Sequence, residues 1–300
     1  ASKIKYSENF ILLNAALKSY RPGASAGIIN LDSLDYNAAF VMKLLGDNFK
    51  VRLTAKSLPS LDLIQHLMAK CHTNRLMVFS EPFIADLLTH FNGDSLDILL
   101  GKPLPADVLT RLSVHKGWNN ISWLIDTKER LNNYLAFAKK ENVKLKISVE
   151  IDVGLHRGGL QTPAELAEVV NTLKANEQFL QLTGLMGYDG HVPYVPFYIN
   201  KQRAIKRAFV NVQQCYTAFV DELKKHYSEQ FLNSLVFDGG GSKTYFYYPE
   251  FKNITPENEI AMGSGFLAPE EFPELLKLGH HRAMYLASPV SKKIATSELP

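Results

Sequence analysis

Short apolar runs recur along the chain, and segments with helical spacing of apolar residues separate them. From Phe49 onward these runs are rich in Val, Ile, Leu and Phe, and they end at Gly, Ser, Asp or similar chain breakers. The runs are Lys50–Lys56, Arg75–Ser80, Leu96–Gly101, Ile121–Asp126, Leu145–Asp152, Leu182–Tyr188, Leu235–Gly239 and Glu259–Gly263. Runs of this length and composition predict eight buried strands.

The segments between the runs predict helices. Asp126 is the expected N-cap of one helix, and Thr162 followed by Pro163 suits the cap and first turn of another. The predicted helices include Leu61–Lys70, Thr127–Glu141, Pro163–Asn176 and Gln202–His226. Alternating strands and helices indicate parallel βα units, and eight of them predict an α/β fold, a closed (β/α)8 TIM-type barrel. An open doubly wound sheet is the alternative.

One strand precedes the eight and is surplus to a barrel. It is Ala26–Leu31, followed by a predicted helix over Leu34–Leu45, and a β-rich segment recurs at Ala283–Ile294. We assign residues 32–268 to the barrel, and residues 1–31 plus 269–300 to a second, mainly β domain. The sequence stops soon after the β-rich segment, so we expect this domain to be incomplete and the natural chain to continue past Pro300.

Composition narrows the class of protein. Apolar residues make up 46% of the chain and charged residues 21%, which is ordinary for a globular protein with a large core. The net charge of +3 is small and unclustered, and no apolar run could span a membrane. We therefore expect neither nucleic acid nor a membrane as a partner. Two cysteines without metal-type spacing, Cys71 and Cys215, favour a reduced cytoplasmic location and buried thiols.

Glycine-rich loops follow the seventh and eighth predicted strands, where such barrels often hold phosphate. The first loop is Asp238-Gly239-Gly240-Gly241-Ser242-Lys243-Thr244, and the second is Met262-Gly263-Ser264-Gly265. Loops of this kind let backbone N–H groups approach an anion without obstruction by Cβ atoms. The first loop imitates a nucleotide-binding P-loop. Because Ser242 stands where that motif requires glycine, we discount nucleotide hydrolysis.

Three other strand ends add candidate chemistry. Lys56 ends the first barrel strand, and a lysine opposite a phosphate site suits a Schiff base with a phosphorylated aldehyde. Arg157 could contact an anionic ring oxygen, or it could pair with Asp152 and close a surface loop. Tyr188 and His191 follow the sixth strand, where they could stack on a ring or move a proton. The alternative for Lys56 and His191 is a solvated side chain.

Five segments, in order, resemble the alanine-racemase-type pyridoxal-phosphate enzymes, in particular their D-threonine aldolase and D-serine dehydratase branch. Arg52–Ser57 is similar to that branch's Arg-Pro-His-x-Lys-Thr segment, and Val149–Gly159 to its "VEIDVGxxRxG" run. The remaining three are Gly184–His191, similar to "GLxxYxGH", Asp238–Tyr245, similar to "GGGTGTY", and Glu259–Ser264, similar to "ELxPGS". The resemblance covers nearly the whole chain.

The resemblance implies a role for each matching residue. Lys56 would form the aldimine with pyridoxal 5′-phosphate, and Arg157 would contact the phenolic oxygen of the cofactor. Tyr188 and His191 would lie near the ring and join Lys56 in catalysis. The phosphate would be held by Gly240, Gly241, Ser242, Gly263 and Ser264.

The implied activity is that of a lyase acting on D-amino acids, by retro-aldol cleavage or dehydration of a D-β-hydroxy-α-amino acid. The resemblance also implies a homodimer with a small-molecule amino-acid substrate. An amino-acid racemase is the alternative, with Tyr285 as the candidate second base. A non-catalytic pyridoxal-phosphate-binding protein is the alternative from another class.

The chain departs from the family pattern at three places. Thr54 and Leu58 replace the histidines that flank the lysine in the aldolase branch. No His-x-Cys pair follows residue 265, and the adjacent His280 and His281 do not substitute for it, so the metal ligands are unknown. Zinc or manganese is expected only if ligands lie beyond residue 300. Ala261 stands where barrel-type racemases have an arginine that keeps the pyridine nitrogen unprotonated, which favours lyase chemistry.

Overall fold

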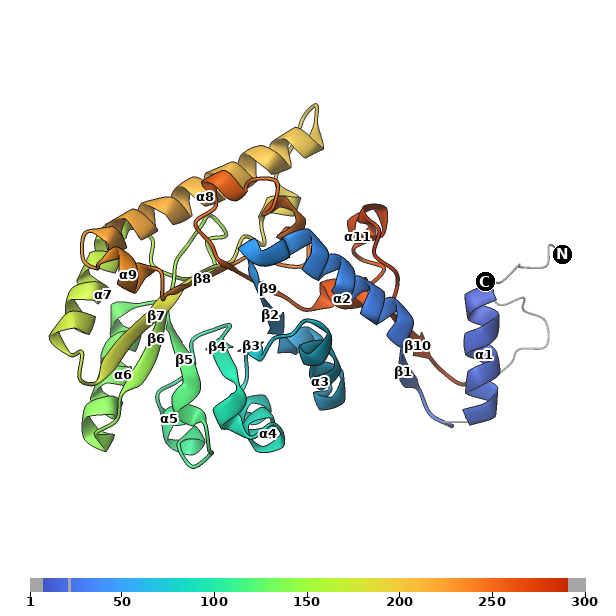
Figure 1. Ribbon diagram of the computed structural model, residues 1–300, viewed down its shortest axis with the longest axis horizontal. Coiled ribbons are helices and arrows are strands. Elements are labelled where there is room, and N and C mark those ends of the chain that lie inside the picture. Colours follow the sequence, from blue (N-terminus) through green and yellow to red (C-terminus); the bar gives the residue numbers. More distant parts are fainter. Residues whose placement is uncertain (1–7, 21–22, 291–300) are drawn as a thin grey trace.

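A closed eight-stranded parallel barrel forms the body of the molecule (Figure 1), in a computed structural model that describes residues 8–20 and 23–290. The predicted barrel is thereby confirmed. Its strands are β2 (Lys50–Thr54), β3 (Arg75–Val78), β4 (Asp97–Leu100), β5 (Ile121–Ile125), β6 (Leu145–Glu150), β7 (Leu180–Gly187), β8 (Val236–Gly239) and β9 (Glu259–Met262). Each overlaps one of the eight predicted runs.

Closure occurs between the last strand and the first. β9 pairs in parallel with β2, from Lys50 opposite Glu259 to Leu53 opposite Met262. Because β2 also pairs with β3 on its other side, no barrel strand has an open edge. This closure excludes the open doubly wound sheet.

Helices surround the barrel and connect its strands (Figure 1). They are α2 (Leu31–Leu45), α3 (Leu61–Lys70), α4 (Glu81–His90), α5 (Asp107–Leu112), α6 (Lys128–Glu141), α7 (Pro163–Ala175), α8 (Lys201–Lys224), α9 (Glu229–Leu232) and α10 (Ser264–Leu267). Thr162 caps α7 as predicted, its side chain accepting from the Glu165 N–H. The prediction for α6 is wrong by one residue. Thr127, not Asp126, accepts from the Arg130 N–H, because only Thr127 precedes the first turn directly.

The predicted second sheet is present beside the barrel (Figure 1). β1 (Ala26–Ile29) and β10 (Met284–Ala287) pair antiparallel, with Ala26 opposite Ala287. This region also contains two helices that the sequence reading missed, α1 (Glu8–Tyr20) and α11 (Pro273–Leu278). Residues 1–7 and 291–300, which include the end of the predicted β-rich segment, lie outside the described residues. The domain boundaries at 31/32 and 268/269 stay a prediction.

A buried asparagine joins α2 to the segment that leads from the barrel to β10. The Asn37 amide donates to the Phe266 and His281 carbonyl oxygens, at 2.8 and 2.6 Å, and its oxygen accepts from the His281 N–H at 2.8 Å. Three of the four hydrogen bonds that an asparagine side chain can make are thus formed inside the protein. These bonds hold the sheet of β1 and β10 against the barrel end that the glycine-rich loops also occupy.

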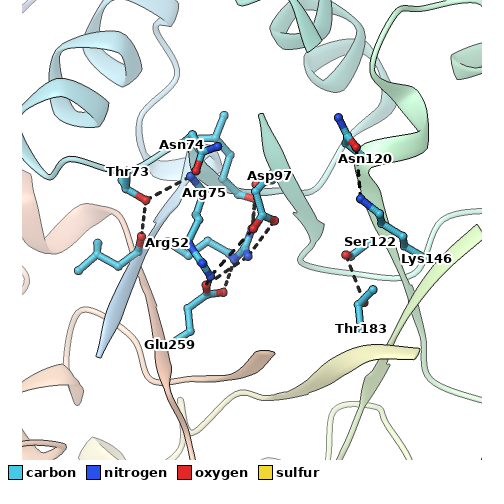
Figure 2. Close-up of polar contacts among 12 residues, drawn as sticks. Arg52, Thr73, Asn74, Arg75, Asp97, Asn120, Ser122, Lys146, Thr183 and Glu259 are labelled. Carbon is cyan, nitrogen blue, oxygen red and sulfur yellow. Dashed lines mark hydrogen bonds and ion pairs between the residues drawn. The ribbon is translucent and has the colours of Figure 1, made fainter. Parts of the chain in front are cut away.

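The interior of the barrel at its N-terminal end contains charged side chains in place of a uniformly apolar layer (Figure 2). Arg52, fully buried on β2, donates through all five of its N–H groups, to the Glu259 and Asp97 carboxylates and to the Leu76 and Asp97 carbonyl oxygens. Arg75 contacts the same Glu259 carboxylate from β3. Four strands, β2, β3, β4 and β9, are therefore joined through one guanidinium. Because Arg52 and Glu259 are both buried, the loss of either one would leave an uncompensated charge inside the protein.

Removing Arg52 should destabilise the protein severely. The variant Arg52→Met leaves the buried Glu259 charge without its main partner, so we expect the free energy of unfolding to fall by about 3–5 kcal/mol. Urea denaturation followed by circular dichroism measures the change. Lys50→Met, an exposed position on the same strand, should shift it by less than about 0.5 kcal/mol. Equal stability of the two variants would contradict the role given to Arg52.

Candidate active site

One cavity opens at the C-terminal ends of the barrel strands, where enzymes of this fold place their active sites. Its wall combines residues from seven of the eight strand ends. Eight of the nine residues predicted from the sequence line it: Lys56, Arg157, Tyr188, Gly240, Gly241, Ser242, Gly263 and Ser264. Residues far apart in the chain thus meet in one place, although their individual roles stay predictions.

Lys56 lies in a single 3-10 turn, Ala55–Ser57, directly after β2. Its ammonium nitrogen is 4.3 Å from the centroid of the Phe79 ring, at the end of β3. Partial burial and the nearby Arg157 guanidinium lower the pKa of Lys56 below its usual value. A larger fraction of neutral amine is therefore present at a given pH, and the neutral amine is the form that attacks a carbonyl group.

Arg157 lies in the loop after β6 and faces two partners. Its guanidinium is 3.6 Å from the Glu150 carboxylate and 5.1 Å from the centroid of the Tyr188 ring. The surface ion pair with Asp152, which the sequence left open, does not form. Asp152 instead accepts from the backbone N–H groups of Gly154 and His156, both at 2.9 Å. Arg157 thus remains directed at the cavity with about half of its side chain exposed.

Tyr188 follows β7, and its ring lies between two glycines. A Cβ atom on Gly190 would come within 2.4 Å of the ring, and one on Gly241 within 3.1 Å. Gly190 must therefore lack a side chain for the ring to lie where it does, and a side chain at Gly241 would shift the ring by a few tenths of an ångström. Burial, and the Asp189 carboxylate next, raise the pKa of Tyr188, so its hydroxyl stays protonated at neutral pH.

The two glycine-rich loops contact each other across the cavity. The Ser242 hydroxyl accepts from the Gly265 N–H at 2.8 Å and from the Ser264 hydroxyl at 3.1 Å. Gly240 has a φ of +76°, a conformation that other residues rarely adopt. A Cβ atom on Gly263 would come within 2.5 Å of the Thr54 carbonyl oxygen on β2. The loops therefore form one continuous cradle of backbone and small polar side chains.

A buried acid behind the first loop was missed by the sequence reading. The Asp189 carboxylate accepts from the Thr244 hydroxyl at 2.8 Å and from the Tyr248 hydroxyl at 3.1 Å. Burial raises the pKa of Asp189 to about 6. The Tyr-Asp-Gly-His run around it was noticed, but only the fold shows that residues 55 and 59 positions later come to lie beside it.

Lys243 is a second cation at the cavity and was not among the predicted site residues. Its ammonium group donates to the Tyr194 hydroxyl at 3.0 Å and to the Glu271 carbonyl oxygen at 3.3 Å. It also lies 4.1 Å from the centroid of the Phe272 ring. Its place inside the Gly-Ser-Lys-Thr string was the available signal. Because this string departs from a P-loop, it did not predict Lys243 as a site residue.

The floor of the cavity includes Ala261 from β9 and Asp238 from the neighbouring strand β8. Asp238 is buried, and among the described residues its Oδ2 atom has no hydrogen-bond partner. Arg52, below it, has no N–H left to donate. Burial and the Glu259 carboxylate raise the pKa of Asp238 well above its usual range, which favours a neutral carboxyl group at the cavity floor.

His191 is the predicted site residue that the fold places elsewhere. It does not line the cavity; its imidazole packs against Gly154, where an added Cβ would lie 3.0 Å from Nε2. Its Nδ1 atom is buried without a partner among the described residues. The chain turns into a short 3-10 helix, Val192–Tyr194, directly after His191.

Residues 29–255 match the family described as "Alanine racemase, N-terminal domain". The chain belongs to this family. Proteins of the family depend on pyridoxal phosphate, in agreement with the resemblance drawn from the five segments. A 3-hydroxy-D-aspartate aldolase of Paracoccus denitrificans (strain Pd 1222) is 25% identical over 164 residues. That match covers 54% of this chain and 38% of the aldolase, so the chain spans well under half of this relative.

Solved structures show the same fold. The D-threonine aldolase from Filomicrobium marinum aligns with a TM-score of 0.72 and 15% identity, over 87% of this chain and 68% of the aldolase. The alanine racemase of Clostridium difficile 630 aligns with a TM-score of 0.69 and 19% identity, over 88% of this chain and 68% of the racemase. Racemase and aldolase are thus similar to this chain to nearly the same degree, and the fold alone does not separate them.

Two further properties bear on the predictions. Within the part of the chain that the structure describes, no three His, Cys, Asp or Glu side chains gather closely enough to hold a metal ion. His280 and His281 have other contacts, since His280 lies 2.5 Å from the Tyr245 hydroxyl and His281 stacks on Tyr36.

Every helix over residues 8–20 and 23–290 is too short or too polar to cross a membrane.

The buried Asp189 carboxyl should make stability depend on pH. Its pKa is about 6 in the folded protein against an ordinary 3.8, so the folded state holds this proton more tightly than the unfolded chain does. The stabilisation is present below the unfolded pKa and is lost as the pH rises through the folded pKa. As the pH rises from about 4 to about 7, the free energy of unfolding should fall by up to about 3 kcal/mol. We expect Asp189→Asn to abolish this pH-dependent fall.

Urea denaturation at several pH values measures this dependence. Asp152→Asn is the matched control with the opposite sign, because hydrogen bonds from His156 and Gly154 lower the pKa of Asp152 despite its burial. Its stabilisation is present above the unfolded pKa and is lost as the pH falls. An unchanged slope in Asp189→Asn would contradict the assignment.

Proposed function

We propose that this chain is the barrel-containing part of a pyridoxal-phosphate-dependent lyase that cleaves or dehydrates D-β-hydroxy-α-amino acids. The observation that supports it best is the meeting of Lys56, Arg157, Tyr188 and two glycine-rich loops around one cavity at the C-terminal end of the barrel. The 3-hydroxy-D-aspartate aldolase similarity supports the substrate class.

The residues present fit the cofactor. Lys56 offers an amine of lowered pKa at the cavity, as an aldehyde requires. Gly240 and Gly263 let the two loops pass close to Ile260 and to the Thr54 carbonyl oxygen, which a Cβ atom would crowd, and the hydroxyls of Ser242 and Ser264 border the cradle. Arg157 supplies a cation for the phenolic oxygen, and the ring of Tyr188 supplies an aromatic surface. Lys243 adds positive charge beside the first loop.

When bound, the cofactor withdraws electrons from the Cα bond that breaks. The chain does the positioning. Gly240–Ser242 and Gly263–Ser264 would hold the phosphate group, and Lys56 would hold the aldehyde group. The Nζ atom of Lys56 would also accept or return a proton. Phe79, against which Nζ packs, limits the positions that this amine can reach.

Ala261 and Asp238 favour lyase chemistry over racemisation. At the position where the family resemblance places the pyridine nitrogen, the chain has Ala261, which cannot hold that nitrogen unprotonated as an arginine would. The nearby Asp238 offers a neutral carboxyl group with an unpartnered oxygen. A hydrogen-bond donor at this end of the ring would make the bound cofactor a stronger electron acceptor, which suits retro-aldol cleavage and β-elimination.

The two alternatives make different demands on the structure. A racemase needs a second base, and Tyr285, the candidate from the sequence, lies on β10 with its hydroxyl donating to the Arg282 carbonyl oxygen at 3.2 Å. It does not line this chain's cavity and would have to act in a partner subunit. A non-catalytic cofactor-binding protein of the single-domain type would lack a second sheet, whereas β1 and β10 form one here.

The homodimer, the cytoplasmic location and a zinc or manganese ion belong to the same proposal. The family resemblance supports the homodimer and the metal, and the two cysteines without metal-type spacing support the cytoplasmic location. Among the described residues, no group of three His, Cys, Asp or Glu side chains could hold this metal. The Tyr188 hydroxyl, which stays protonated, would donate a hydrogen bond to the β-hydroxyl group of the substrate at the cavity.

The cofactor and its lysine can be tested by absorption. Purified protein incubated with pyridoxal phosphate should show a visible band that borohydride removes, and Lys56→Ala should lack it. Lys102→Ala, an exposed lysine just beyond β4, should retain the band. A band that persists in Lys56→Ala would contradict the assignment of the lysine, and no band in either protein would contradict cofactor binding.

The reaction can be tested with D-threonine and D-serine. We expect release of glycine and acetaldehyde, or of a 2-oxo acid and ammonia, with D- but not L-substrates. Ala261→Arg should lower kcat for lyase turnover at least about tenfold, equivalent to about 1.4 kcal/mol, and should shift the cofactor's absorption spectrum. Val192→Ile, a buried change outside the cavity, serves as the matched control. Racemisation without cleavage or dehydration would overturn the argument from Ala261.

A further inference from the structure

A second cavity, of about 360 Å³, lies at the N-terminal end of the barrel, opposite the candidate active site. Barrel interiors are usually filled by branched apolar side chains. Here three consecutive strands instead present Ser122 (β5), Lys146 and Ser148 (β6), and Gln181 and Thr183 (β7). The interior is therefore hollow and polar on this side, beside the ion cluster around Arg52 (Figure 2).

A β-bulge builds the wall of this cavity. The register of β6 against β7 moves from Ile147 opposite Leu182 to Ser148 opposite Gly184, which leaves Thr183 without a partner residue. The Thr183 hydroxyl lies 3.0 Å from the Ile147 carbonyl oxygen and 3.2 Å from the Ser122 hydroxyl. Bulges recur where a strand redirects a side chain, often at functional sites. Here the bulge brings hydroxyl groups of three strands to the cavity.

The charge of this cavity is incompletely neutralised. The Lys146 ammonium group donates to the neutral amide oxygen of Asn120 at 3.2 Å (Figure 2). Over residues 8–20 and 23–290, no carboxylate lies within ion-pair distance of it. The cavity's other charged residues are paired, Arg52 with Asp97 and Glu259, and Asp94 with Lys116 at 2.7 Å. A cation beside three hydroxyls lacks only a counter-ion.

We propose that this cavity binds a small hydroxycarboxylate with a single negative charge, with its carboxylate on Lys146 and its hydroxyl among Ser122, Ser148 and Thr183. One cation matches one negative charge. Asp94 and Asp97, on the opposite wall, disfavour a ligand with a second charge. Exposed rim residues, among them Gln181 and Ser234, leave the cavity accessible from solvent.

The same strands connect the two ends of the barrel. β6 carries Lys146 near its N-terminal end and Glu150, the partner of Arg157, at its C-terminal end. β7 likewise carries Thr183 at the second cavity and Met186 at the active-site cavity. A ligand bound between these strands at the N-terminal end would therefore contact the two strands that position active-site residues at the C-terminal end. The binding site itself is independent of the proposed cofactor and reaction.

Isothermal titration of the pyridoxal-phosphate-loaded protein with sodium lactate tests the site, at constant ionic strength set with sodium chloride. Lactate should bind more tightly than acetate, which lacks the hydroxyl, and more tightly than malonate or inorganic phosphate, which carry more charge. Lys146→Met should weaken lactate binding at least about tenfold, as expected for a lost charge-assisted hydrogen bond. Lys144→Met, an exposed lysine two positions earlier, should leave it unchanged.

Two further variants separate this site from the active site. Lys56→Ala should bind lactate as the unaltered protein does, because Lys56 lines only the other cavity. If Lys146→Met does not fold, Ser148→Val, which removes one hydroxyl from the cavity and keeps the lysine, must weaken binding instead. Affinity that survives both Lys146→Met and Ser148→Val, affinity lost in Lys56→Ala, or no binding of lactate at all would each overturn the proposal.

Discussion

The contact on which the rest of this structure depends is the one between Arg52 and Glu259 at the seam of the barrel. The two residues belong to β2 and β9, the strands whose pairing closes the sheet. A buried guanidinium is stable only when its donors are satisfied, and Arg52 satisfies all five by reaching three other strands. Its position on β2 and that of Lys56 are consequently coupled, because only four residues separate them.

The saturation of Arg52 also shapes the chemistry above it. Asp238 lies close enough to be affected by Arg52 but receives no hydrogen bond from it, so its carboxyl group favours the neutral form at the floor of the cavity. Ala261 leaves that floor without a competing cation. Thus the ion cluster in the N-terminal half of the barrel influences the protonation of Asp238 at the floor of the C-terminal cavity.

The two proposed binding sites, at opposite ends of the barrel, are built from different parts of the chain. The C-terminal end relies on loops in which glycines allow close approach, as at Gly241 beside Tyr188 and at Gly263 beside Thr54. The N-terminal end relies on strand side chains, redirected by the bulge at Thr183. Loops vary easily without disturbing the barrel, whereas side chains inside the strands are fixed by register. We therefore expect substitutions at the N-terminal end to affect stability more strongly.

The features that depend on local pattern were predictable from the amino-acid sequence. Eight apolar runs ending in chain breakers predicted the barrel strands, because apolar residues are the ones that become buried. Glycine-rich loops at the C-terminal strand ends predicted the cradle, because glycine gives the backbone its conformational freedom. Lys56, Arg157 and Tyr188 followed from their place at strand ends.

The remaining features became apparent only in the folded protein. It showed Asp189 beneath Thr244 and Tyr248, Lys243 beside Phe272, and His191 packed on Gly154 away from the cavity. It also revealed α1 and α11, whose short or weakly patterned sequences carry little periodic signal. These features depend on contacts between residues distant in the chain, and local propensity contains no information about such contacts.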